Sequence, residues 1–293
     1  MPELPEVETI VRELRKKIIG LRITDIWVDP ERPVKTGHGA GWSQIKKYVI
    51  GKKIVGIRRR AKYIVLDLEG PKTIFIHQKI SGHLLYGRWE LIKKKWEAES
   101  GPLRDDSRNG YIRLVMFLNN NFQLGLSDLR RFAKLILVDD NKVKDLKEMS
   151  KLGPEPLDLT FNQFRQLFTF KKGRLKQVLM DPKFIAGIGN IYGDEILWDA
   201  GYHPFSRVEG LKNLDLKKIY SSTKKVLLKA IKYQGDSMDD YRLPSGLKGR
   251  YQTIQKAYQQ TGKKCLKKDG GIIQRLKLNQ RSAHFCSVHQ KLL

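Results

Sequence analysis

A segment rich in proline and glycine divides this chain into two stretches with different hydrophobic patterns. Residues 151–159 read KLGPEPLDL, and the two prolines and one glycine in this segment oppose both helix and strand. Short runs rich in β-branched residues precede the segment, and apolar residues at helical spacing follow it. We therefore expect one domain over residues 1–150, a linker over 151–159 and a mainly helical region beyond it.

The first stretch predicts one helix followed by an antiparallel β-structure. Pro5 suits the first turn of a helix, apolar residues then recur at helical spacing, and Gly20 ends the pattern. Short strand-like runs follow, at 22–28, 53–58, 62–68, 73–77, 111–118, 122–126 and 134–138. Closely spaced short strands are typical of an antiparallel sandwich or barrel. Residues 93–110 are expected to form a long exposed loop.

The second stretch predicts helices and then short strands. Helical spacing of apolar residues occurs at 160–169, 173–180, 189–199 and 214–234. The tail, residues 250–293, turns to short strand-like pieces that are interrupted by Gly270 and Gly271.

The charge of the chain points to a polyanionic partner. Lys and Arg number 57 against 31 Asp and Glu, which gives a formal net charge of +26. Phosphates bound by such a surface release condensed counterions, so nucleic acid is the expected partner. The alternatives are a Lys-rich solvated surface, which usually carries more acids, and an anionic membrane surface.

Other features of the composition favour a cytoplasmic protein. No run of about 18 apolar residues is present, and the N-terminus lacks the apolar core of a signal peptide. The two cysteines, Cys265 and Cys286, are too few for a disulfide scaffold. They fit a reducing compartment or the remnant of a metal site.

The N-terminus carries residues capable of covalent chemistry. The small residue Pro2 permits removal of Met1, which leaves a secondary amine that can attack an aldehyde-like carbon and form an iminium ion. Glu3 is placed to move protons in that step. Taken alone, the same residues are equally an ordinary lead-in to a helix.

Seven motifs, in order along the chain, resemble the formamidopyrimidine-DNA glycosylase family, which includes endonuclease VIII. They are MPELPEVET at 1–9, RRAKY at 59–63, HQKISG at 77–82, DLRRF at 128–132, LGPEPL at 152–157, GIGNIYGDE at 187–195 and QRSAHFC at 280–286. Together they span nearly the whole chain.

The resemblance implies an α+β multidomain fold. Its parts would be an N-terminal antiparallel β-sandwich with a leading helix over 1–150, the linker over 151–159, a helix–two-turn–helix DNA-binding domain over 160–249 and a β-hairpin finger over 250–293. The partner would be double-stranded DNA that contains oxidised bases or abasic sites, with no membrane, and the protein is expected to be a monomer.

The resemblance also implies a bifunctional DNA glycosylase and abasic-site lyase of base-excision repair. Pro2 would attack C1′ of the damaged nucleotide to form a Schiff base, and Glu3 would protonate the sugar ring oxygen. Lys62 matches a lysine with a proton-donor role in elimination, although in the basic run 58–62 it is alternatively a phosphate contact. Arg281 matches a finger arginine assigned to the second step of β,δ-elimination.

Further positions match DNA-contacting residues of the family. Those expected to contact DNA, mainly its phosphates, are Arg131, Lys172, Lys176 and Asn190. A base that leaves the stack must be replaced by a wedge, and Ile80, Arg130 and Phe132 match the wedge positions. The usual wedge motif is HLGMSG, so Ile80 stands in place of Met and Lys79 in place of Gly.

The hairpin finger departs most from the family pattern. Relatives often carry two C-x-x-C pairs around zinc, whereas here the pairs read CLKK from Cys265 and CSVH from Cys286. Lys268 is a poor zinc ligand because its nitrogen stays protonated. We therefore expect no cofactor for the chemistry and a zincless finger. If a metal is present, the ligands would be Cys265, Cys286 and His289, with His284 or Asp269 in the fourth place.

Two details bear on the substrate. Leu4 in the PELPE start resembles the branch of the family that acts on oxidised purines, so 8-oxoguanine and formamidopyrimidines are the expected lesions. The alternatives are an oxidised-pyrimidine glycosylase and a non-catalytic damage-binding module. Residues 235–241 resemble the lesion-recognition loop of the family, or else form a plain linker to the finger.

Overall fold

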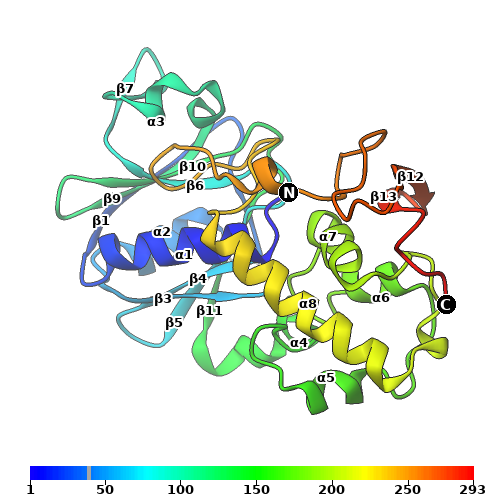
Figure 1. Ribbon diagram of the computed structural model, residues 1–293. Coiled ribbons are helices and arrows are strands. Elements are labelled where there is room, and N and C mark those ends of the chain that lie inside the picture. Colours follow the sequence, from blue (N-terminus) through cyan, green and yellow to red (C-terminus); the bar gives the residue numbers. More distant parts are fainter. Residues whose placement is uncertain (38–40) are drawn as a thin grey trace. The chain divides into compact units, whose positions relative to one another are not determined.

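The protein folds into two compact units, each made from two segments of the chain. The computed structural model describes residues 1–37 and 41–293 (Figure 1). One unit comprises Met1–Met149 and Tyr233–Gln252, and the other comprises Ser150–Lys232 and Thr253–Leu293. None of the helices in the described ranges combines the length and hydrophobicity needed to span a bilayer.

The first unit is a β-sandwich with a leading helix, as the sequence predicts. Helix α1 (Leu4–Ile18) buries its apolar stripe. Basic residues occupy its last turn, where their positive charge interacts favourably with the negative end of the helix dipole. One sheet has the order β1 (Ile23–Val28), β9 (Ile112–Leu118), β10 (Gln123–Ser127) and β6 (His83–Gly87). The other has the order β2 (Lys35–Thr36), β11 (Lys134–Asp139), β5 (Lys72–His77), β4 (Tyr63–Leu68) and β3 (Ile54–Arg60).

The main hydrophobic core of the first unit joins the two sheets and α1. It contains buried residues of the helix, such as Val7 and Leu14, and of both sheets, such as Ile64 and Met116. Among the described residues, the strands of the two sheets pair antiparallel, except β2 with β11, which are parallel. Helix α2 (Trp42–Val49) and the short helices η2 (Asp140–Asp145) and α4 (Lys147–Ser150) complete this part of the chain. The core holds the loops at the strand ends in fixed positions.

The prediction of a long exposed loop over 93–110 was wrong. The region contains the hairpin β7 (Trp89–Ile92) and β8 (Lys95–Ala98), followed by the one-turn helices α3 (Pro102–Asp105) and η1 (Ser107–Gly110). Trp96 is buried in a second small core, where its ring meets the ring of Trp27 edge-on at 5.4 Å. Strands of four residues are too short to show a clear alternation, so the sequence does not reveal them.

The second unit is helical and ends in a hairpin. Its helices are α5 (Phe161–Leu167), α6 (Leu175–Met180), α7 (Asn190–Ala200) and α8 (Asn213–Lys232). The one-turn helix η3 (Val208–Gly210) precedes α8. A further one-turn helix, η4 (Tyr251–Ile254), begins in the first unit and ends in the second. The hairpin pairs β12 (Ile273–Leu278) with β13 (Arg281–Cys286). Seven residues of α7 are buried, so this helix forms the centre of the unit.

Two predicted domain boundaries differ from the structure. Residues 151–159 contain no helix or strand, but they pack on the second unit through hydrogen bonds between Gly153 N and Pro182 O and between Ala186 N and Pro154 O, both of 2.9 Å. Residues 233–252 belong to the first unit, whereas the helical domain was predicted to run over 160–249. The contacts of residues 151–159 reach 29 and 32 positions along the chain, and that of Asp236 with Glu6 reaches 230, separations that local sequence patterns do not report.

Candidate active site and nucleic-acid interface

Pro2 and Glu3 immediately precede α1 and are buried in the first unit. Only 3% of Glu3 is exposed. The backbone N–H of Glu3 donates to Glu6 Oε2 at 2.7 Å, so the glutamate in the first turn of α1 holds the backbone at the start of the helix. The two expected catalytic residues therefore lie on an ordered backbone.

Lys62 lies on the tight turn between β3 and β4. Arg59 fastens this turn to α1 through an ion pair with Glu8, whose closest N–O distance is 2.8 Å, and Arg59 also donates to Ala61 O. Lys62 is half-buried and its charge acts on His77. Burial, followed by the charges of Lys79 and Lys62, lowers the pKa of His77 to about 3, so its imidazole is neutral at physiological pH.

The structure brings the predicted wedge residues together. Ser81 donates to Asp128 and accepts the backbone N–H of Arg130 at 2.9 Å, which joins the loop at 78–82 to the loop at 128–132. Phe132 is 40% exposed, and the Arg130 guanidinium lies 5.2 Å from the centre of its ring. Ile80 is half-buried on the facing loop. An exposed aromatic ring with a cation above it suits stacking against bases.

The loop that carries Ile80 contains two unfavourable features. Lys79 has φ = +57°, a left-handed conformation that favours glycine, and it occupies the glycine position of the usual HLGMSG motif. Gln78 is 1% exposed, and neither polar atom of its side chain has a hydrogen-bond partner among the described residues. A buried amide without partners opposes folding.

Gln78→Leu is expected to stabilise the protein by about 1–2 kcal/mol, because it removes two buried polar atoms at nearly constant volume. Chemical denaturation of the variant and the parent measures the difference. Gln163→Leu, at a residue whose amide oxygen does accept a hydrogen bond, serves as the control and should not stabilise. A lower free energy of unfolding for Gln78→Leu would show that a bound water or another group satisfies the amide.

The second unit offers an anion site at the start of α7. Asn190 is the first residue of α7, and Gly189 forms its N-cap, so the positive end of the helix dipole lies there. A cavity of about 450 Å³ adjoins this end and is lined by Asn190, Tyr258, Gln259, Thr261, Arg275, Ser282 and His284. Arg275 and Tyr258 were not singled out from the sequence, since only the fold of the hairpin brings them to α7.

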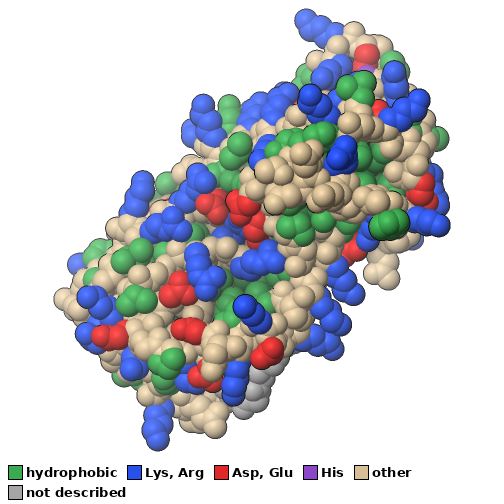
Figure 2. Space-filling view, turned by 90° about the horizontal axis from the view of Figure 1, so that it is seen from below, with side chains coloured by type: hydrophobic (Ala, Val, Ile, Leu, Met, Phe, Trp, Pro, Cys, Tyr) green, Lys and Arg blue, Asp and Glu red, His purple; other side chains and the backbone are tan. Residues whose placement is uncertain are grey.

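Arg281, Arg131 and Lys172 are exposed, as side chains that contact DNA must be. Arg281 begins β13, opposite Leu278 in the hairpin, and Arg131 occupies the loop at 128–132. Lys and Arg side chains are spread over the whole face seen in Figure 2, with Asp and Glu among them. The positive charge is therefore not confined to one patch on that face.

Lys176 is not exposed, as a residue in direct contact with DNA would have to be. Its side chain is fully buried, and its ammonium makes an ion pair with Asp194 Oδ1 at 2.6 Å. The ammonium also donates to Asn190 Oδ1 at 2.8 Å and to Ser282 O at 2.6 Å. The other oxygen of Asp194 binds the backbone and the ring of His284 on β13. The lysine thus joins α6, α7 and the hairpin, and the aspartate that pairs with it is recognisable only in three dimensions.

Lys176→Met is expected to lower the free energy of unfolding by about 3–5 kcal/mol, because it leaves the buried carboxylate of Asp194 without its cation. Lys172→Met, at the exposed lysine four positions earlier, is the matched control and should change stability by less than about 0.5 kcal/mol. Denaturant unfolding followed by circular dichroism compares the two. Equal small effects would mean that Lys176 is not part of the core.

Four potential metal ligands converge at the base of the hairpin. They are Cys265, Asp269, Cys286 and His289, whose ligand atoms all lie within 4.8 Å of one another. His289 Nδ1 lies 3.4 Å from Cys265 Sγ and 2.9 Å from Asp269 Oδ2, and Cys286 Sγ lies 3.4 Å from the same oxygen. The other ring nitrogen, His289 Nε2, lies 3.0 Å from Trp198 O, as is common for metal-bound histidines.

The chemistry of this cluster suits zinc. Two thiolates, an imidazole and a carboxylate are ligands that zinc binds in tetrahedral sites. Lys268, on which the expectation of a zincless finger depended, is exposed and has φ = +56°. The next residue, Asp269, takes its place among the donors. The expectation of a zincless finger is therefore not confirmed.

Comparison with known proteins agrees with this architecture. A model of the formamidopyrimidine-DNA glycosylase N-terminal domain matches residues 1–135, and a model of the H2TH domain of the same glycosylase matches residues 152–242. The formamidopyrimidine-DNA glycosylase of Heliobacterium modesticaldum is 34% identical over 293 residues, covering 99% of this chain and 100% of that protein. The enzyme of that name from Lactococcus lactis subsp. lactis is 32% identical with the same coverage.

Solved structures give the same result. A variant of the Lactococcus lactis protein in complex with DNA containing Fapy-dG matches with a TM-score of 0.83 at 32% identity, over 99% of this chain and 100% of that one. A complex of the Lactococcus lactis protein with DNA containing an abasic site matches with a TM-score of 0.82 at 31% identity, over 99% of both chains.

This architecture, a sandwich with a leading helix followed by a helical unit and a terminal hairpin, is that of the DNA glycosylases of base-excision repair that also cleave abasic sites. The similarity to formamidopyrimidine-DNA glycosylases extends over 99% of the chain. The chain belongs to the formamidopyrimidine-DNA glycosylase family.

Proposed function

We propose that this protein excises oxidised purines, such as 8-oxoguanine and formamidopyrimidines, from duplex DNA and then cleaves the strand by β,δ-elimination. The observation that carries the proposal is the ordered N-terminus, where buried Pro2 and Glu3 directly precede α1 in a chain of this family. The Lactococcus lactis relative has been solved with Fapy-dG in its DNA. The bacterial relatives and the DNA substrate support a cytoplasmic, nucleoid-associated location.

The N-terminal residues would carry out the covalent chemistry. Removal of Met1 converts the Pro2 nitrogen from an amide to a secondary amine, whose lone pair attacks C1′ as the bond from C1′ to the damaged base breaks. Glu3 passes a proton to the sugar ring oxygen, so that the ring opens and an iminium ion remains. Lys62 and Arg281 would then assist the two eliminations that release the strand ends.

The remaining site residues would hold the DNA. Arg131, Lys172 and Asn190 would bind phosphates, and Ile80, Arg130 and Phe132 would fill the space left by the flipped base. Lys176 supports this interface indirectly. Its side chain is buried away from solvent, and its ammonium donates to the side-chain oxygen of Asn190. Asn190 thereby keeps its amide N–H groups available for a phosphate.

We also propose that the hairpin binds one structural zinc ion through Cys265, Asp269, Cys286 and His289. The ion would have a structural role, because its four ligands, from the segment before β12, the end of β13 and the turn after it, complete a tetrahedral site and leave no open position for a substrate. It would stabilise the hairpin that presents Arg281.

One alternative is an oxidised-pyrimidine glycosylase, favoured by a solved complex of the Lactococcus lactis relative with DNA containing an oxidised pyrimidine. The test is a panel of duplexes that carry 8-oxoguanine, a formamidopyrimidine, thymine glycol or an abasic site, each incubated with and without borohydride. The proposal requires cleavage of the purine lesions and a covalent adduct in borohydride. Preference for thymine glycol would establish the alternative, and absence of any adduct would identify a binding module.

A further inference from the structure

The loop at 235–241 brings an additional carboxyl group to the N-terminal end of α1. The backbone N–H of Asp236 donates to Glu6 Oε1 at 2.8 Å, while the other oxygen of Glu6 accepts the N–H of Glu3. One carboxylate therefore holds the backbones of Glu3 and Asp236 together. Gly235, at φ = +77°, permits this approach, because a Cβ there would lie 2.7 Å from Glu6 Oε1.

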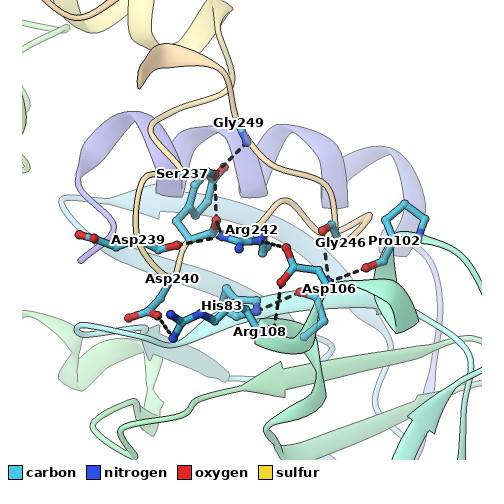
Figure 3. A network of polar contacts seen from close by, with 12 residues as sticks. His83, Pro102, Asp106, Arg108, Ser237, Asp239, Asp240, Arg242, Gly246 and Gly249 are labelled. Carbon is cyan, nitrogen blue, oxygen red and sulfur yellow. Dashed lines mark hydrogen bonds and ion pairs between the residues drawn. The ribbon is translucent and has the colours of Figure 1, made fainter. Parts of the chain in front are cut away.

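A network of polar contacts holds the same loop on the first unit (Figure 3). Ser237 Oγ donates to Tyr241 O and accepts the N–H of Gly249, both at 2.8 Å. Arg242 Nε lies 2.6 Å from Asp106 Oδ2, and Arg108 pairs with Asp240 at 2.7 Å. The position of Asp236 is thus set by its own hydrogen bond to Glu6 and by the contacts of the residues that follow it.

The side chain of Asp236 is buried among charges of both signs. It is 6% exposed, and its Oδ1 accepts the N–H of Met238 at 3.1 Å. The charged groups that act on it include the carboxylates of Glu3 and Asp239 and the ammonium group of Met1, and Glu6 accepts its backbone N–H. Burial raises the pKa of Asp236 to about 6, with Glu3 and Asp239 adding to the rise and the Met238 N–H and the ammonium group of Met1 opposing it. Removal of Met1 transfers that ammonium charge to the Pro2 nitrogen.

The proposed reaction needs a group that accepts a proton from the N-terminal amine, and the mechanism given above does not name one. An N-terminal amine is mostly protonated at neutral pH and has to lose a proton before its lone pair can attack. Glu3 is assigned to the sugar ring oxygen, so a second proton acceptor beside the amine allows both protons to move within one turnover. A base that titrates near the working pH is the most effective acceptor.

We propose, on the basis of the proposed function, that Asp236 accepts the proton that the Pro2 amine releases before it attacks C1′. The N–H bond of the ammonium breaks and the proton passes to the carboxylate, directly or through one water molecule. The lone pair then forms the bond to C1′, and the damaged base leaves with the electrons of the glycosidic bond. The remaining proton on nitrogen moves to the ring oxygen by way of Glu3 as the iminium ion forms.

The test is the pH dependence of single-turnover excision from an 8-oxoguanine duplex between pH 5 and 9. The parent protein should lose activity toward acid with a midpoint near pH 6. Asp236→Asn should lose this acid limb and react about 100-fold more slowly at pH 7, and Asp236→Glu should restore both. Asp145→Asn, at an exposed aspartate of the same unit, makes the same change in charge and should keep the parental limb.

Borohydride trapping separates this inference from the function on which it depends. No adduct with the parent protein at any pH would refute the proposed function itself. An adduct, together with an unchanged limb and rate in Asp236→Asn, would overturn only the role of Asp236. If Asp236→Asn does not fold, Asp236→Ser, which keeps an oxygen for the Met238 N–H, replaces it with the same expected result.

Discussion

Pro2→Gly is expected to reduce base excision by at least about 100-fold while leaving the affinity for undamaged duplex unchanged. Glycine offers a primary amine without the ring that orients the proline nitrogen, and a displacement of about 1 Å at a reacting atom costs roughly this factor. Proline and glycine at this position each provide one N-terminal amine, so the substitution changes no charge and binding should not change. Single-turnover excision and equilibrium binding to undamaged duplex measure the two effects separately.

Retention of Met1 provides a second form of the same test. Protein isolated with Met1 still attached carries an amide at Pro2, which has no basic lone pair and cannot form an iminium ion. It should bind duplex normally and give no adduct in borohydride, whereas the processed protein should be trapped. Normal excision by the unprocessed form, or by Pro2→Gly, would remove the N-terminal amine from the mechanism.

Zinc removal is expected to unfold the hairpin and abolish DNA cleavage. Structural zinc in small domains contributes about 10–16 kcal/mol of apparent binding free energy, which is also folding free energy. Elemental analysis should find one zinc per chain. Chelation should remove the zinc and, as a consequence, abolish the affinity for DNA. Asp269→Ala should weaken zinc retention, because it removes one of four donors.

Lys268→Ala is the matched control for Asp269→Ala. Its side chain is exposed and is not among the four converging ligands, so zinc content should be unchanged. A protein that contains no zinc, and that keeps full activity after chelation, would instead support a zincless finger held by apolar packing.

Much of the fold follows from local patterns in the sequence. The apolar spacing from Val7 to Ile18 and the proline at position 5 specify α1, because a helix buries one stripe and tolerates proline in its first turn. Seven predicted strand-like runs correspond to strands of the sandwich. The ordered motifs, from PELPE at the N-terminus to QRSAHFC in the hairpin, are sufficient to identify the family.

Only the tertiary structure decides which side chains meet across long distances in the chain. Lys176 has the sequence context of a surface lysine, but it is buried because Asp194 and Ser282 O surround its ammonium. Asp269 has the context of a turn residue, but the hairpin places it beside His289. Asp236 reaches Glu6 only because the chain returns to the first unit after α8.

The physical reason is the same in each case. Hydrophobic periodicity and turn chemistry act over a few residues, so they are legible in the sequence itself. The partners of a buried charge or a metal ligand are instead selected by packing, and a buried charge is stable only when that packing supplies its counter-charge. The sequence by itself therefore determined the family and the N-terminal chemistry expected of it. The fold decided which lysine is structural, which aspartate joins the cluster of metal ligands and which additional carboxyl group the chain brings to the N-terminal end of α1.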